Sequence, residues 1–261
     1  MKRFIDDIKK YYKYIIYSIK SELKNEVIGS YLGWLWLILE PLCFMLIYTF
    51  ISVVVFDRGT RYIAAFVFIG LSMWNFFNKT LVASVKMVTN NKDIVTKVYV
   101  PKFVLLLIKM GVNLFKMGIS FVLVFISMIL YKVPISFNVL WLIPVIIILI
   151  LFTFGISCFL LHFGVFAEDL SNLTTLVLKF LFYLSGIFYS IPDRIPKPYN
   201  NYLLNTNFTA GIINAARDSL LYASHPRFKF MIAWLFISLF LCYFGIKKIY
   251  KYENTYVKVM R

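Results

Sequence analysis

Segment 139–166 contains 28 consecutive residues without one Asp, Glu, Lys or Arg, which excludes a water-soluble globular fold. About 20 apolar residues in a helix are enough to cross the hydrocarbon core of a bilayer. Five further segments are long and mostly apolar, and 61% of the 261 residues are hydrophobic, against roughly 45–50% in soluble proteins. The sequence therefore predicts an all-α membrane protein with six transmembrane helices, at about 34–56, 62–85, 103–131, 139–166, 173–190 and 230–246.

The basic residues indicate how these spans are oriented. The net charge is +16, but the lysines lie beside apolar segments, where they meet anionic lipid headgroups, so we expect no nucleic-acid partner. Segments 1–33, 86–102 and 247–261 together carry sixteen Lys and Arg residues, whereas the segments on the opposite side carry eight. Because cytoplasmic loops hold the excess of Lys and Arg, both termini are predicted to face the cytoplasm.

The first 30 residues are predicted to be a separate unit. Apolar residues recur at helical spacing from Phe4 to Leu23, and lysines occupy the other face. This pattern predicts an amphipathic helix at 1–30 that lies in the cytoplasmic interface of the membrane. Packing of the same face against other protein is the alternative. Residues 31–261 are predicted to form a single transmembrane domain with a cytoplasmic tail at 247–261.

Two of the connections are predicted to have structure of their own. In the cytoplasmic loop 86–101, Asn90-Asn91 indicates a turn, residues 92–99 suit a short helix, and Pro101 suits the start of the next helix. The external segment 191–226 begins with a run of prolines and continues with apolar residues at helical spacing, but it is too polar to span. It is predicted to form short or re-entrant helices at the outer interface.

Sequence signatures of catalysis and metal binding are missing. The chain contains no G-x-x-x-x-G-K-[ST] loop, so it cannot bind and hydrolyse ATP in that way, and no catalytic residue is assigned. It has two histidines and no H-E-x-x-H or Cys/His cluster, so no metal site is expected. The three cysteines lie within apolar runs, where cysteine behaves as a small hydrophobic residue.

Lys109 and Lys116 lie inside the third predicted span, although a lysine at the bilayer centre costs roughly 2.5–3.5 kcal/mol. Because they are seven residues apart, they share one helical face. Our hypothesis is that this face lines an internal aqueous path and attracts a phosphate-bearing substrate. The alternative is that the two side chains snorkel to the membrane surface. Glu40, the acid of the first span, is expected to pair with a neighbouring lysine.

Several stretches resemble one family, in the same order along the chain. Leu32-Gly33, Trp36 and Pro41 look like its L-G-x-x-W-x-x-x-x-P segment, and residues 70–74 look like its G-L-x-x-W segment. Further matches are the N-x-x-L-I-x-K-V-x-x-P segment at 90–101, the small-residue break in span five at 185–189, and an arginine after the external helices at Arg217. The chain thus resembles the membrane-spanning permease subunit of bacterial type-2 ABC exporters for O-antigen, teichoic acid and capsular polysaccharide.

The chain departs from this family pattern at two places. Glu168-Asp169 stands where the family has an Arg-Asp pair, which leaves a salt bridge at that turn without support. Asn207-Phe208 replaces a common Asn-Pro before the last external helix, a change that concerns local geometry alone.

The resemblance implies a homodimer that associates with two copies of a separate ATPase subunit, which would bind ATP and Mg²⁺. It also implies that the substrate is a polysaccharide linked through pyrophosphate to a polyprenyl lipid, exported across the bacterial inner membrane. The residues expected to couple the chain to the ATPase are Asn90, Asn91, Lys92, Asp93, Ile94, Lys97 and Val98. Those expected along the substrate path are Lys109, Lys116, Trp36, Tyr48, Trp74 and Arg217, the aromatic residues because their rings stack on sugars.

Two other functions stay open at this point. A type-2 ABC permease for another lipid or a drug would share the architecture, although such permeases usually carry a larger external domain. A membrane-embedded transferase acting on lipid-linked sugars would need acids or histidines converging at one membrane face. Only His162, Glu168 and Asp169 come near to that arrangement.

Overall fold

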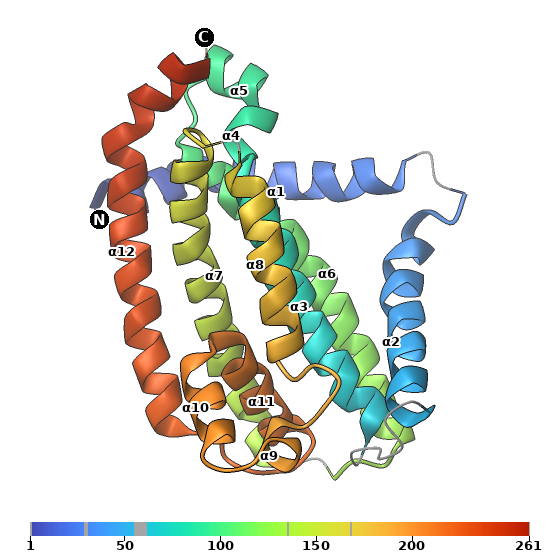
Figure 1. Ribbon diagram of the computed structural model, residues 1–261. Helices are drawn as coiled ribbons and strands as arrows, with labels where there is room; N and C mark the ends of the chain where they lie inside the picture. Colours follow the sequence, from blue (N-terminus) through green and yellow to red (C-terminus); the bar gives the residue numbers. More distant parts are fainter. Residues whose placement is uncertain (1, 29–30, 55–61, 135, 168, 261) are drawn as a thin grey trace.

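The computed structural model describes residues 2–28, 31–54, 62–134, 136–167 and 169–260, and the regular structure within these ranges is entirely helical. Most of the longer helices run along a common direction, and α1 lies across them (Figure 1). The helices are α1 (Lys2–Val27), α2 (Trp36–Val54), α3 (Ile63–Val85), α4 (Met87–Asn90), α5 (Lys92–Lys97), α6 (Lys102–Leu130), α7 (Leu142–Gly164), α8 (Leu170–Leu184), α9 (Ile191–Arg194), α10 (Tyr199–Thr206), α11 (Phe208–Leu220) and α12 (Phe228–Met260), with 3₁₀ turns at Gly33–Leu35 and Phe137–Trp141.

In the described part of the chain, five helices are long and apolar enough to cross a membrane. They lie within Gly33–Ile51, Ile63–Val85, Lys102–Leu130, Phe137–Gly164 and Phe228–Tyr256. The fifth predicted span corresponds to α8, which has 15 residues and is therefore only about 22 Å long. It ends before a turn in which Gly186 has a φ of 62°, so the predicted count of six full-length spans is not confirmed.

The helices α2 and α3 differ sharply in how much of their surface is covered. In α3, 78% of the 18-residue apolar stretch long enough to span a membrane is buried inside the protein, because α6, α7, α8 and α11 pack around it. In the corresponding stretch of α2 no residue is buried, although this helix is as apolar as a membrane span. The centre of the bundle is therefore α3, whereas α2 stands at its edge (Figure 1).

Small residues let α7 and α12 pack closely. A Cβ atom added to Gly155 would lie 2.7 Å from the Cβ of Leu241 and 3.1 Å from the backbone nitrogen of Cys242. A Cβ on Gly245 would lie 2.7 Å from the Cβ of Cys158. Both cysteines are buried in this seam, which confirms their role as small packing residues, since close approach of membrane helices requires such side chains.

The amphipathic pattern at the N-terminus does form a helix, α1, and its apolar face packs against the bundle. The ring of Phe4 lies 4.8 Å from that of Phe103 in α6, Ile19 covers Gly111, and Leu23 is buried. The apolar face therefore packs against protein, here the helices of the same chain, and this is the alternative to burial of that face in the membrane interface. Lysines cover the exposed face, and the position of α1 in a membrane interface stays a prediction.

Short helices do form in the segment 191–226, at the end of the bundle opposite α5 (Figure 1). Asn207 caps α11, because its side-chain oxygen accepts hydrogen bonds from the backbone nitrogens of Thr209 (3.1 Å) and Ala210 (3.4 Å). The asparagine therefore keeps this role without the proline of the family pattern. Helix α12 continues without a break to Met260 and so includes most of the segment predicted as a cytoplasmic tail at 247–261, whose side of the membrane stays a prediction.

We predict opposite effects for two glycine-to-alanine substitutions. Gly155→Ala should lower the unfolding temperature of the purified chain in detergent, because overpacking a tight contact costs about 1–3 kcal/mol. Gly118→Ala is the matched control, because a Cβ there meets no atom within 4 Å, and alanine favours a helix by up to about 1 kcal/mol. Equal melting temperatures for the two variants would contradict the close packing of α7 on α12.

Candidate functional site: a charged groove and a protruding loop

A polar groove lies between α2, α3 and α6, within helices that are otherwise apolar. Its charged and polar wall residues are Ser72, Asn75 and Lys79 from α3, Asn113, Lys116 and Ser120 from α6, and Glu40 from α2. On both α3 and α6 the three residues have the same spacing, so each set occupies one helical face and extends over about 10 Å. The two faces are joined by a hydrogen bond of 3.0 Å from the Asn113 amide to Thr80.

The lysines of this region are paired with acids. Lys79 Nζ lies 3.1 Å from Glu40 Oε1, which confirms the expected pairing of Glu40. Lys116 Nζ lies 2.5 Å from Glu26 Oε2, and Lys109 pairs with Glu22. Ion pairing offsets part of the cost of keeping a lysine away from water.

Two acids of α1 are thus aligned with two lysines of α6. Lys109 and Lys116 do share a face, but that face lies against α1, and Lys109 lines a second pocket beside α1 and α4 rather than the groove. The partners Glu22 and Glu26 were not among the predicted site residues, although their spacing of four on a helix was an available signal. Lys79 and the matching polar faces of α3 and α6 were not predicted either. The role of the lysines in a substrate path stays a prediction.

The aromatic residues expected along the substrate path lie away from the groove walls. Trp36 is 54% exposed at the start of α2. Trp74 is only 5% exposed; its ring packs 5.4 Å from that of Phe182, and it borders a cleft between α3 and α8. The side chain of Tyr48 lies outside the described part of the structure. The fold does not bring Trp36 or Trp74 into the groove with Lys116.

Arg217 is buried and serves the fold. Its guanidinium donates hydrogen bonds to the carbonyl oxygens of Phe66 (3.1 Å), Gly186 (2.8 Å) and Ile187 (2.8 Å). It also lies 3.4 Å from the centre of the Phe66 ring. Burial lowers the pKa of Arg217 to about 9, so the group is still charged at neutral pH. Arg217 therefore joins α11 to α3 and to the turn after α8, and these contacts account for its position without a substrate.

Helices α4 and α5 protrude at one end of the bundle, beyond α1 (Figure 1). All seven residues assigned to coupling lie here, and Lys92, Asp93 and Lys97 are exposed. Two apolar side chains of the same segment are exposed as well, Ile94 at 39% and Val98 at 57%. Val95 instead points into the protein and is buried. A surface of exposed aliphatic and charged side chains on a short helix is suited to contact another protein.

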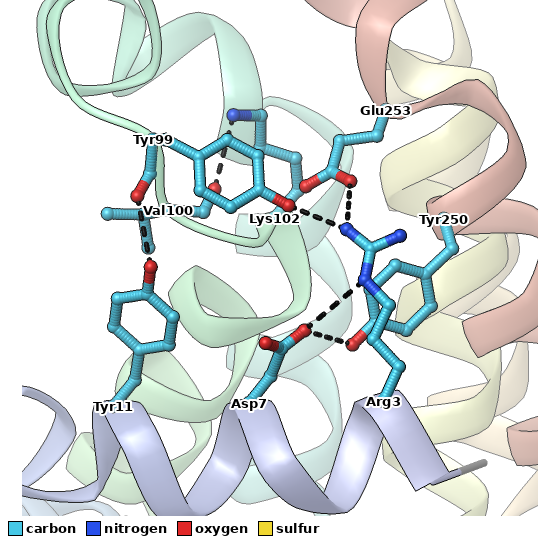
Figure 2. A network of polar contacts seen from close by, with 8 residues as sticks. All are labelled: Arg3, Asp7, Tyr11, Tyr99, Val100, Lys102, Tyr250 and Glu253. Carbon is cyan, nitrogen blue, oxygen red and sulfur yellow. Dashed lines mark hydrogen bonds and ion pairs between the residues drawn. The ribbon is translucent and has the colours of Figure 1, made fainter.

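A network of polar contacts ties this protruding loop to both ends of the chain (Figure 2). The Arg3 guanidinium donates to the hydroxyl of Tyr99 (2.7 Å) and to Glu253 of α12 (3.1 Å). The hydroxyl of Tyr11 donates to the backbone carbonyl of Tyr99 (3.2 Å), and that of Tyr250 donates to Asp7 (2.6 Å). The loop is thereby held to α1 and α12. The bonded residues are so far apart in the sequence that no local pattern could have predicted these contacts.

Charge and burial oppose each other within this network. Burial lowers the pKa of the Arg3 guanidinium, but the nearby Tyr99 and Glu253 raise it by more, so the pKa lies above its ordinary value. Burial raises the pKa of Tyr99, and the negative charge of Glu253 adds to this effect. At neutral pH the network therefore joins a charged Arg3 to a neutral phenol.

The sequence profile of the ABC-2 type transporter family matches residues 14–221 of this chain, which include the groove and the protruding loop. The chain belongs to the ABC-2 type transporter family. The family is one of transporter membrane subunits that work with an ABC ATPase, so this permease is a multi-pass membrane protein and not itself the ATPase. Five residues of the Figure 2 network lie outside the matched range: Arg3, Asp7, Tyr11, Tyr250 and Glu253.

Individual relatives extend the comparison over nearly the whole permease. An O-antigen export system permease protein of Klebsiella pneumoniae is 25% identical over 251 residues, which cover 94% of each chain. A second such protein of the same organism is 28% identical over 209 residues, or 78% of each chain. One from Myxococcus xanthus is 26% identical over 191 residues, covering 73% of this permease and 74% of the relative.

We predict that Arg217→Lys lowers the unfolding temperature of the purified permease. A lysine cannot reach three carbonyl oxygens at once, and each buried carbonyl left without a donor costs about 1–3 kcal/mol. The matched control is Arg227→Lys, because Arg227 is exposed and donates to the side chain of Asn201 at 3.2 Å. If both variants melted at the wild-type temperature, the proposed structural role of Arg217 would be wrong.

Proposed function

We propose that this permease is the membrane subunit of an ATP-driven exporter that moves polyprenyl-pyrophosphate-linked polysaccharide of the O-antigen type out of the cytoplasm across a bacterial inner membrane. The observation that carries the proposal is the similarity to an O-antigen export permease along 94% of both chains, from α1 into α12. Membership of the ABC-2 family supports the transport role independently of any single relative.

In this proposal, energy comes from two copies of a separate ATPase subunit. The permease contains no phosphate-binding loop in its sequence, so ATP and Mg²⁺ would bind to the partner alone. Helix α5 would seat in the ATPase, with Ile94 and Val98 in apolar contact and Lys92 and Lys97 near acidic groups. Its protrusion beyond α1 supports this role (Figure 1). Both termini, which lie near α5, would then face the cytoplasm.

A second copy of the permease would complete the transport path. The apolar stretch of α2 has no buried residue, and an exposed face of that size suits either lipid or another protomer. In a homodimer, the path would run between the two copies, so that closure of the ATPases could widen it. Trp36 and Tyr48 on α2 would border this path, where aromatic rings can stack on sugar rings as the polymer passes.

The charged groove supports an anionic substrate. A pyrophosphate carries several negative charges, and lysines in a low-dielectric setting attract such a group strongly. Lys116 lies in the groove between α2, α3 and α6, and Lys109 lies nearer to α4. The two lysines would therefore guide the linker of the glycan lipid from the membrane surface toward the space beside α2.

We predict that the permease copurifies with its cognate ATPase and exports a polyprenyl-pyrophosphate-linked glycan in liposomes. Transport should require ATP and be inhibited by vanadate. Lys109→Gln with Lys116→Gln should slow it severalfold, because the pyrophosphate would lose two positive partners. Lys132→Gln, at an exposed lysine beyond α6, is the control. Unchanged transport in the double variant would remove these lysines from the path, and the absence of any glycan transport would refute the proposed function.

We also predict that Ile94→Asp with Val98→Asp abolishes copurification with the ATPase, because two carboxylates would replace the aliphatic contact surface of α5. Both side chains are exposed, so the melting temperature of the permease alone should stay at the wild-type value. Tyr202→Asp on α10 is the matched control at the opposite end, where the side chain is 66% exposed. Copurification of the α5 variant at wild-type yield would exclude α5 as the docking element.

A further inference from the structure

Each lysine of the groove between α2, α3 and α6 is paired with an acid. Lys79 and Lys116 contribute two positive charges, and their partners Glu40 and Glu26 contribute two negative charges. Such a groove is electrically neutral as it stands, although its wall also contains neutral polar groups that can bind an anion. Within the described residues, the amide of Asn75 has no hydrogen-bond partner, so it is available to a ligand.

The two carboxylates reach the lysines from outside the α3–α6 wall. Glu26 belongs to α1 and Glu40 to α2, whereas the lysines belong to the helices that form the wall. All four side chains are partly exposed, between 25% and 44%. Because the lysines are partly exposed in their ion pairs, a stronger anion can reach them and compete with the carboxylates.

We propose that Glu26 and Glu40 are built-in counter-ions of a lipid-diphosphate site, and that the diphosphate headgroup displaces both of them to bind Lys79, Lys116 and Asn75. This inference rests on the proposed function, and it deepens it by naming the residues that receive the headgroup and the contacts that keep the site neutral beforehand. A diphosphate offers more charge and more acceptor oxygens than a carboxylate, so it forms the stronger charge-assisted hydrogen bonds.

The exchange has a structural consequence for α1 and α2. In the unliganded chain, Glu26 holds the C-terminal part of α1 to α6, and Glu40 holds α2 to α3. Occupation of the site by a diphosphate removes both contacts at once. The headgroup therefore loosens α2, which has the smallest buried share of the five candidate spans in the described residues, from the wall of the bundle. Binding and opening of the groove beside α2 become a single event.

The test measures binding of geranylgeranyl diphosphate to the purified full-length permease in nanodiscs of neutral lipid, without ATP or ATPase. Glu26→Gln with Glu40→Gln should bind about five- to tenfold more tightly than wild type, because two ion pairs no longer compete for the lysines. Lys79→Gln with Lys116→Gln should lose binding. The variant with all four substitutions leaves no charge unpaired, so it should fold normally and still fail to bind. Lys229→Gln, at an exposed lysine of α12, is the control.

Two further ligands identify which part of the probe is recognised. Inorganic pyrophosphate should compete with the same dependence on the variants, whereas phosphatidylglycerol, a monoanionic phosphodiester, should compete at least tenfold more weakly. Equal competition by phosphatidylglycerol would overturn the assignment to a diphosphate. Equal or weaker binding by the double glutamine variant at Glu26 and Glu40, or retained binding by the fourfold variant, would overturn the counter-ion exchange.

This binding experiment is independent of transport. A permease that shows the predicted pattern of affinities but exports no glycan would refute the proposed function and leave the diphosphate site intact. A permease that exports the glycan while all variants bind the probe equally would refute the site and leave the function intact.

Discussion

The constraint on which the structure depends is that a polar group within the bilayer must find its partner inside the protein. An unpaired donor or charge in hydrocarbon costs several kcal/mol, and helices meet this demand for the backbone. Side chains meet it by local bonds, as when the hydroxyls of Ser72 and Thr80 donate to the carbonyls one turn earlier in α3.

The turn after α8 illustrates how this constraint shapes the fold. When α8 ends after 15 residues, the carbonyls of Gly186 and Ile187 lose their helical partners within a buried region. Arg217 of α11 supplies the missing donors and also bonds to Phe66 of α3. A broken helix is thereby joined to the central helix and to the short helices at that end, so the break is a fixed element of the fold.

Helix α1 connects the two regions that we associate with function. Its N-terminal part contacts the protruding loop through Arg3 and Tyr11, and its C-terminal part contacts α6 through Glu22 and Glu26. A rigid helix that touches both the loop and the groove can transmit a displacement from one to the other. Under the proposed function, the polar contacts of Figure 2 would therefore link the loop that docks on the ATPase to the groove.

The long continuous apolar segments by themselves determined that the chain is helical, because a helix of about 20 apolar residues spans the bilayer and satisfies its own backbone there. They also placed four of the long helices to within a few residues. The sequence also located α1, the α5 loop and the family resemblance. The length of α8 and the unbroken helix of α12 could not be read from composition, because both depend on what the neighbouring helices offer. Only the tertiary structure decided that Lys109 and Lys116 meet Glu22 and Glu26, that Lys79 completes a groove, and that Arg217 serves the fold. These contacts join residues from 30 to 151 positions apart, and a local sequence pattern carries no record of which distant side chain will supply the partner.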